Sequence, residues 1–147
     1  MQGPEHFVGR PILPNLILLP AEIRNTTGIG SPFAIEGFEA IVFQLDVTAA
    51  ATDVGDTLDV FVQTTIDQTT WLDVVHFTQV LGNGNAKRFI SKLSASLALT
   101  EYETGTALGA ASVRHIFGDQ WRVRWAITDA STQNASFNFS VKANAFG

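Results

Sequence analysis

The chain has 147 residues, which fits a single domain, and it contains no cysteine, which excludes disulfide bonds and thiolate metal ligands. Its 9 basic and 14 acidic residues give a net charge of −5, and this balance argues against a nucleic-acid partner. Leu16–Leu19 is too short an apolar run to span a membrane, and residues 1–5 carry no cationic leader, so we expect no membrane partner.

The first 20 residues contain four of the five prolines, and this density decides how the segment is interpreted. Proline lacks a backbone donor, so residues 1–32 cannot form a helix interior or a central strand, and we interpret them as an extended N-terminal arm. The alternative is an edge strand at Asn15–Leu19. Because the arm is too apolar to remain in water, its aliphatic residues form the predicted interface: Ile12, Leu13, Leu16, Ile17, Leu18 and Leu19.

The alternation of an extended segment gives this arm two apolar sides. Leu16 and Leu18 would point one way, and Ile17 and Leu19 the other way, since successive side chains lie on opposite sides. One domain could cover only one of these sides, so the other side requires another copy of the chain or a different subunit. We therefore expect that a chain lacking residues 1–20 still folds but associates less strongly.

Residues 33–147 are predicted to form the folded domain, because apolar and polar residues alternate in short segments that turns separate. Gly82–Asn85 is the strongest tight-turn signal, and the next strand is expected to return from it. Residues 94–112 show no clear period and allow a weak strand near Leu97–Tyr102 or a loop. The sequence predicts an all-β, antiparallel β-sandwich that is jelly-roll-like, with strands at residues 41–47, 58–64, 71–81, 87–93, 121–127 and 137–143.

The last two predicted strands carry the clearest core pattern. Arg122 and Arg124 alternate with large apolar residues, so they lie on the outer face, where we expect them to meet Asp residues of a neighbouring strand or subunit. The inward face is the predicted core: Trp121, Val123, Trp125, Ile127, Phe137, Phe139 and Val141.

The side chains that could hold a metal ion do not follow a known pattern. Asp53, Asp56 and Asp59 could offer oxygen ligands to calcium, but their spacing differs from that of helix-flanked calcium loops. We interpret these residues as turn caps, and we predict no metal and no cofactor. The three histidines also lack the spacing of metal ligands: His6, His76 and His115.

The sequence contains no recognisable catalytic constellation. A hydrolase needs a nucleophile, a base and an orienting group, and no Gly-x-Ser-x-Gly motif occurs. Glu101 and Glu103 could form a carboxylate pair on one strand face, but nothing in the sequence distinguishes an acid from a base. We therefore predict that the chain is not an enzyme and that no residue is catalytic.

About half of the chain resembles small structural proteins of tailed bacteriophages. Four runs carry the resemblance, and two of them contain tryptophan: Leu45–Ala50, Gly55–Thr64, Thr70–Gly82 and Phe117–Trp125. The resemblance implies a component of the virion. It assigns no functional residue.

Among virion components, the small size, low charge and apolar arm favour a capsid decoration protein, which binds the major capsid protein and stabilises the outer head lattice. The class implies a homotrimer whose arms reach neighbouring capsomers. A tail, neck or head-fibre component is the alternative within the virion. A further alternative is a carbohydrate- or receptor-binding sandwich, for which Tyr102 and the strand face of Phe61 are the candidate aromatic residues.

Overall fold

The computed structural model describes residues 11–49, 53–99, 101–130 and 135–147. The regular secondary structure in these ranges consists of β-strands alone. No helix is present there that could cross a membrane. The strands are β1 (Ile12–Arg24), β2 (Gly28–Ile29), β3 (Phe33–Ala34), β4 (Ala40–Val47), β5 (Thr57–Thr65), β6 (Trp71–His76), β7 (Val80–Leu81), β8 (Lys87–Ser94), β9 (Ser112–Val113), β10 (Gln120–Thr128) and β11 (Phe137–Phe146).

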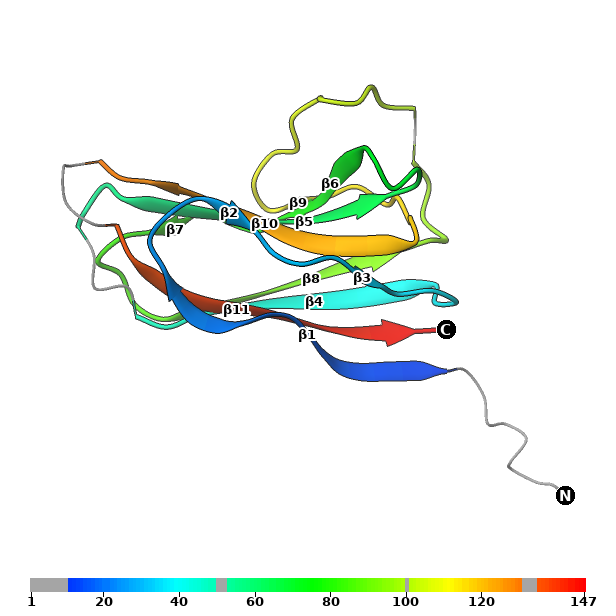
Figure 1. Cartoon of the computed structure of the whole chain (residues 1–147), viewed down its shortest axis with the longest axis horizontal. Helices are drawn as coiled ribbons and strands as arrows, with labels where there is room; N and C mark the ends of the chain where they lie inside the picture. Colours follow the sequence, from blue (N-terminus) through cyan, green and yellow to red (C-terminus); the bar gives the residue numbers. More distant parts are fainter. Residues whose placement is uncertain (1–10, 50–52, 100, 131–134) are drawn as a thin grey trace, which may run out of the picture.

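The strands form two antiparallel sheets, which are the two layers of Figure 1. Sheet A has the order β1-β11-β4-β8, and sheet B has the order β2-β10-β5-β6-β9. In sheet B, β3 follows β2 along β10, and β7 follows β6 along β5. If each such pair is counted as one interrupted strand, the two layers have four strands each, with β9 added, in jelly-roll order. The predicted all-β, jelly-roll-like sandwich is therefore confirmed.

The turn between β7 and β8 carries the chain from sheet B to sheet A. Asn83 has a positive φ of 56°, which agrees with the turn predicted at Gly82–Asn85. The strands on its two sides do not pair, because β7 lies beside β5 in sheet B and β8 lies beside β4 in sheet A. The expectation that the chain returns along the preceding strand is wrong here. A turn reverses the chain, but the partner of a strand depends on non-local packing.

The N-terminal segment is an edge strand of the sandwich. β1 pairs with β11 from Ile12 to Arg24, and β2 and β3 then pair with β10 in sheet B. Within the described residues, the predicted boundary between residues 1–32 and 33–147 does not coincide with any division of the fold. The alternative of an edge strand at Asn15–Leu19 is what the structure shows, over a longer segment.

Bulges shape β1 and explain how an edge strand holds two prolines. The register against β11 shifts near Pro14, near Leu18 and near Pro20. The middle shift turns Leu18 and Leu19 into the core together, at 5% and 4% exposure. The strict alternation predicted for this segment is therefore wrong, because one extra residue breaks the period of two.

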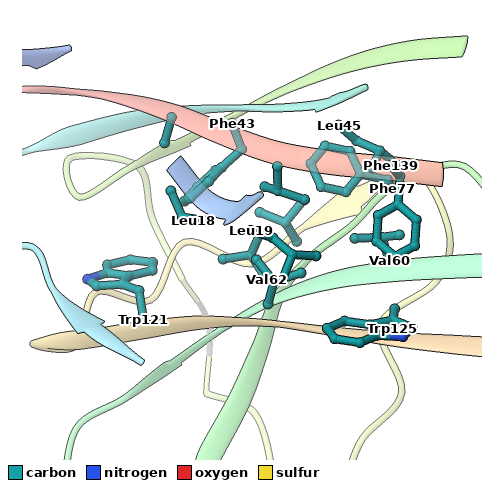
Figure 2. Close-up of a cluster of buried hydrophobic side chains, with 14 of the residues drawn as sticks. Leu18, Leu19, Phe43, Leu45, Val60, Val62, Phe77, Trp121, Trp125 and Phe139 are labelled. Atoms are coloured by element: carbon teal, nitrogen blue, oxygen red, sulfur yellow. The ribbon is translucent and has the colours of Figure 1, made fainter. Parts of the chain in front are cut away.

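The core lies between the two sheets, as Figure 2 shows. Trp121 packs against Phe43 at a ring-centroid distance of 6.1 Å, and Trp125 meets Phe139 edge-on at 5.9 Å. Ile127, near the end of β10, is only partly buried. The other members of the predicted core are all buried: Trp121, Val123, Trp125, Phe137, Phe139 and Val141.

A long loop joins β8 to β9 and rises above sheet B in Figure 1. Its described residues contain no strand near Leu97–Tyr102, so the loop interpretation of this segment is the observed one. Glu101 and Glu103 are exposed on either side of Tyr102 in sequence, and they do not share a strand face. The loop places Tyr102 where it meets the outer face of sheet B.

Candidate interaction surfaces

The outer face of sheet A is built from all four of its strands. In the observed register, Ile17 on β1, Lys142 on β11, Gln44 on β4 and Ile90 on β8 form one row across the sheet. We call this surface the open face. It consists of the outward residues of these strands, among them Ile12, Ile17, Ile23, Val42, Ile90 and Lys142.

Four isoleucines on the open face are exposed to an extent that is uncommon for such residues. Ile12 and Ile17 are each 59% exposed, and Ile23 is 66% exposed. Ile90, at the opposite edge of the sheet, is 59% exposed. A single exposed aliphatic residue has no special meaning, but four on one sheet face make this face a candidate contact surface.

A shallow depression lies near the middle of the open face. Its volume is about 160 Å³, close to the roughly 150 Å³ of a cavity that accepts a benzene-sized group. One wall is formed by Asn15, whose φ of 56° is positive and whose backbone N–H donates to Asn144 Oδ1 at 2.7 Å. Val42 and Ile90 supply apolar walls, and Lys142 adds a cation. The depression therefore suits one apolar side chain of a partner.

The two edges of sheet A are poorly suited to pairing with another strand. β1 is irregular and contains Pro14 and Pro20, which lack backbone donors. β8 carries Lys87, Arg88 and Lys92, and charged residues on an edge strand discourage strand addition. Contact through the open face is therefore more favourable than edge-to-edge pairing.

The structure divides the predicted interface residues of β1 into two groups. Leu18 and Leu19 belong to the core of their own domain, and Leu16 is half-buried. Ile12, Leu13 and Ile17 remain exposed. Ile23 and Ile90 lie on the same face and were not predicted from the sequence. Ile90 and the buried Leu93 are three residues apart on β8 and so lie on opposite faces, but the register with β4 was needed to tell which face is outward. Ile23 follows a bulge in β1 that has no sequence signal.

The outer face of sheet B has paired polar side chains at its centre, and Ile29 and Leu81 are exposed apolar residues toward its ends. Arg124 donates from Nε to Asp73 Oδ1 at 2.9 Å and from Nη2 to Asp73 Oδ2 at 2.8 Å. Gln63 also donates to Asp73, at 2.9 Å, and accepts from Arg122 Nε at 2.7 Å. Burial alone would raise the pKa of Asp73, but the hydrogen bonds and charge of Arg124 outweigh it, so the pKa lies below its ordinary value. The predicted contact between an outer arginine and an Asp is confirmed for Arg124.

Each arginine on this face also lies over an aromatic ring. The guanidinium-to-centroid distances are 4.1 Å for Arg122 over Trp71, 3.6 Å for Arg124 over Phe61 and 3.9 Å for Arg114 over Tyr102. His76 stacks on the same Phe61 ring at 3.9 Å. These cation–π contacts hold the polar side chains in fixed positions. They also connect the β8–β9 loop, through Tyr102, to the sheet.

A bulge brings the polar residues of β6 to one face. Asp73 and His76 are three positions apart, which would place them on opposite faces of a regular strand. The pairing shifts between Val62 and Gln63 of β5, so Gln63 lies opposite Asp73 and Phe61 lies opposite His76. The prediction of one regular strand over 71–81 could not reveal this grouping.

His76 fastens the loop to the sheet with both of its ring nitrogens. Nδ1 lies 2.8 Å from the carbonyl oxygen of Leu108 in the loop, and Nε2 lies 2.8 Å from Asp59 Oδ1 on β5. Gln79 donates to the other oxygen of Asp59 at 2.9 Å. Both ring nitrogens therefore have an oxygen partner within the protein, one on the loop and one on the sheet.

Between the loop and the sheet lies a cleft of about 410 Å³, which we call the arginine–aromatic cleft. Phe61, Trp71, Asp73, His76, Arg114 and Arg124 form its floor and sides, and Tyr102 with residues 105–108 forms the wall on the loop side. Of these aromatic residues, Phe61 and Tyr102 were expected from the sequence. Trp71 was missed, because the bulge that turns β6 outward has no sequence signal.

The remaining candidates for chemistry have structural partners or lie apart. Asp56 is buried and accepts hydrogen bonds from the backbone N–H groups of Asp53 and Ala130, as a turn cap does. Asp59, on β5, contacts His76. His115 Nδ1 accepts from the Ser94 backbone at 3.0 Å. His6 lies outside the described residues. Among the residues that are described, no three His, Asp or Glu side chains group as a metal site.

Comparison with known proteins adds one finding about the fold. No family model matches the sequence, and no curated protein matches it. The fold is shared with a viral protein. The structure is similar to that of the VP2 subviral particle of infectious bursal disease virus, with a TM-score of 0.54 and 9% identity. The match covers 93% of this chain but 32% of the VP2 chain, so this chain corresponds to about a third of VP2. At this identity the likeness shows the fold alone.

Proposed function

We propose that this chain is a non-enzymatic structural protein of a virion and that its open face binds other virion subunits. The observation that carries the proposal is the group of exposed isoleucines on one sheet face that no other described element covers. Two further observations support it. Four sequence runs resemble structural proteins of tailed bacteriophages, and the fold is similar to that of a protein that forms a subviral particle.

Capsid decoration is the role that we favour within the virion. A protein that binds the assembled lattice, and not its free subunits, stabilises the lattice by mass action. A homotrimer would hold several such contacts at once, so the second and third contacts would form at high effective concentration. A tail, neck or head-fibre component is the alternative, and it would use the same open face on a different neighbour.

The charges of the open face indicate the chemistry of the partner. Arg88, Lys92 and Lys142 lie on this face. Asp46 lies opposite Arg88 on the neighbouring strand and forms an ion pair with it at 3.3 Å. The chain as a whole carries a net charge of −5, so the open face differs in sign from the rest of the molecule. We therefore propose that the major capsid protein offers an apolar and acidic surface to it.

The polar side chains support a non-enzymatic role. Both ring nitrogens of His76 contact oxygen atoms of the protein itself. Glu101 and Glu103 are both exposed on a loop rather than opposed across a cleft. Among the described residues, no Ser or Thr hydroxyl is hydrogen-bonded to the side chain of His76, Glu101 or Glu103.

The test is sedimentation of the chain with empty capsids of the cognate phage that lack it. The variants Ile17→Ser and Ile23→Ser should each weaken binding by roughly 5- to 30-fold, which corresponds to about 1–2 kcal/mol of lost apolar contact. Ile66→Ser is the matched control, since Ile66 is also 66% exposed but lies in the turn after β5. Equal binding by all variants would refute the role of the open face. Binding to tails instead of capsids would favour the alternative position.

A further inference from the structure

We propose that the arginine–aromatic cleft is a binding site for a neutral glycan. This inference does not depend on the proposed capsid contact, because the cleft lies on sheet B and the open face lies on sheet A. A glycan ligand would give the chain a second partner on the surface opposite its docking surface. The volume of about 410 Å³ is within the range of roughly 300–1,000 Å³ that is usual for small-ligand sites.

Both arginines that line the cleft already donate hydrogen bonds to acceptors within the protein. Arg124 forms a two-point ion pair with Asp73. Arg114 donates to three backbone carbonyls, those of Asp73, Thr106 and Ala107, at 3.3–3.4 Å. An anionic ligand would therefore have to break existing contacts, because no arginine of the cleft lacks acceptors. This favours a ligand without charge.

The groups that remain available suit hydroxyl groups. Neither the indole N–H of Trp71 nor the hydroxyl of Tyr102 forms a hydrogen bond with another described residue, although both residues line the cleft. Asp73 Oδ2 receives one hydrogen bond from Arg124 and keeps a second lone pair. A sugar hydroxyl both donates and accepts, so adjacent hydroxyls can satisfy donors and acceptors that are fixed side by side. A purely apolar ligand would leave these groups unpaired.

The aromatic residues supply the apolar part of such a site. Arg122 covers one face of Trp71 but does not line the cleft, so the indole surface that faces the cleft is a different one. Tyr102 projects from the loop on the opposite wall. The C–H faces of a sugar ring can pack against these rings while its hydroxyls reach Asp73. Because Arg122, Arg124 and Arg114 hold the rings, the site is ordered before the ligand arrives.

The indole N–H signals of the three tryptophans provide a sharp test in the full chain. Trp121 and Trp125 donate to the carbonyls of Ile35 and Thr26, so their signals are internal controls, and Trp71→Phe assigns the third signal. An array with equal numbers of neutral and acidic glycans first identifies binders. Each binder is then titrated into ¹⁵N-labelled protein, up to about 10 mM, tenfold above a weak dissociation constant of about 1 mM.

The expected result is that a neutral glycan shifts the Trp71 signal saturably and leaves those of Trp121 and Trp125 unchanged. Tyr102→Phe removes one hydroxyl and should weaken binding by about two- to twelvefold, the value of one neutral hydrogen bond. Ile17→Ser, on the open face, should leave glycan binding unchanged and serves as the control for folding. The proposal is overturned if no neutral glycan moves the Trp71 signal, or if acidic glycans alone bind.

Discussion

The outer face of sheet B carries three arginines that the protein itself pairs with carboxylate, amide, carbonyl and aromatic groups, and the β8–β9 loop lies over it. The outer face of sheet A carries four isoleucines that are each more than half exposed. Sheet B thus pairs the polar groups at the centre of its outer face, although Ile29 and Leu81 are exposed on it, whereas sheet A exposes isoleucines along two of its strands that no other described residue buries. The difference teaches that the sheet face with the larger network of polar side chains need not be the face that binds other subunits.

The largest expected effect follows from deletion of residues 1–20, which removes most of β1. The sequence alone led to the expectation that such a chain would fold, but Leu18 and Leu19 are core residues in the structure. Their burial is worth about 3–6 kcal/mol together, a large part of the usual stability of about 5–15 kcal/mol. We expect loss of the cooperative thermal transition in circular dichroism. A truncated chain that melts like the full chain would show that sheet A does not need β1.

The two sides of β1 can be compared directly through neighbouring residues of similar size. Leu19→Ala should lower the free energy of unfolding by about 2–5 kcal/mol, because it leaves a cavity in the core. Ile17→Ala should change it by less than about 0.5 kcal/mol, because Ile17 is exposed in the isolated chain. Urea unfolding measures both values. Similar losses for the two variants would mean that the open face is already covered.

Loss of the ion pair on sheet B should lower the free energy of unfolding, whereas loss of an exposed isoleucine side chain on sheet A should leave it nearly unchanged. Arg124→Ala leaves the half-buried Asp73 carboxylate without its main partner, and we expect a loss of about 1–3 kcal/mol. A double-mutant cycle with Asp73→Ala should give a coupling energy of about 0.5–3 kcal/mol. Additive losses would indicate that the two side chains act independently, and the self-sufficiency of this face would then be in doubt.

The smallest effect concerns acid pH at the turn that follows β5. Backbone N–H groups of Thr70 and Thr69 donate to Asp67 and lower its pKa from 3.8 to about 2. Because the folded-state value lies below the unfolded one, the contribution of this carboxylate is present above pH 3.8 and is lost as the pH falls through about 2. A carboxyl-carbon NMR titration should give this midpoint, and a midpoint near 3.8 would mean that the turn does not form as described.

Much of both faces follows from the sequence, because the period of two is local. Arg122 and Arg124 were placed outside and Trp121 and Val123 inside from alternation alone, and the structure agrees. Phe61 and Tyr102 were recognised as candidate aromatic residues, and the structure places both at one cleft. The fold class also followed from the spacing of strands and turns.

Tertiary structure decided which strands pair and where the alternation breaks. The shift in β1 buried Leu18 beside Leu19, and the bulge in β6 brought Asp73 and His76 to one face. A bulge arises when one extra residue fits better between two sheets than a regular strand would, so its position depends on the partner strand. The sequence by itself determined the inward and outward pattern within each strand, since each side chain has its own affinity for water. The grouping of those strands into an open face and a cleft depended on contacts between residues far apart in the chain.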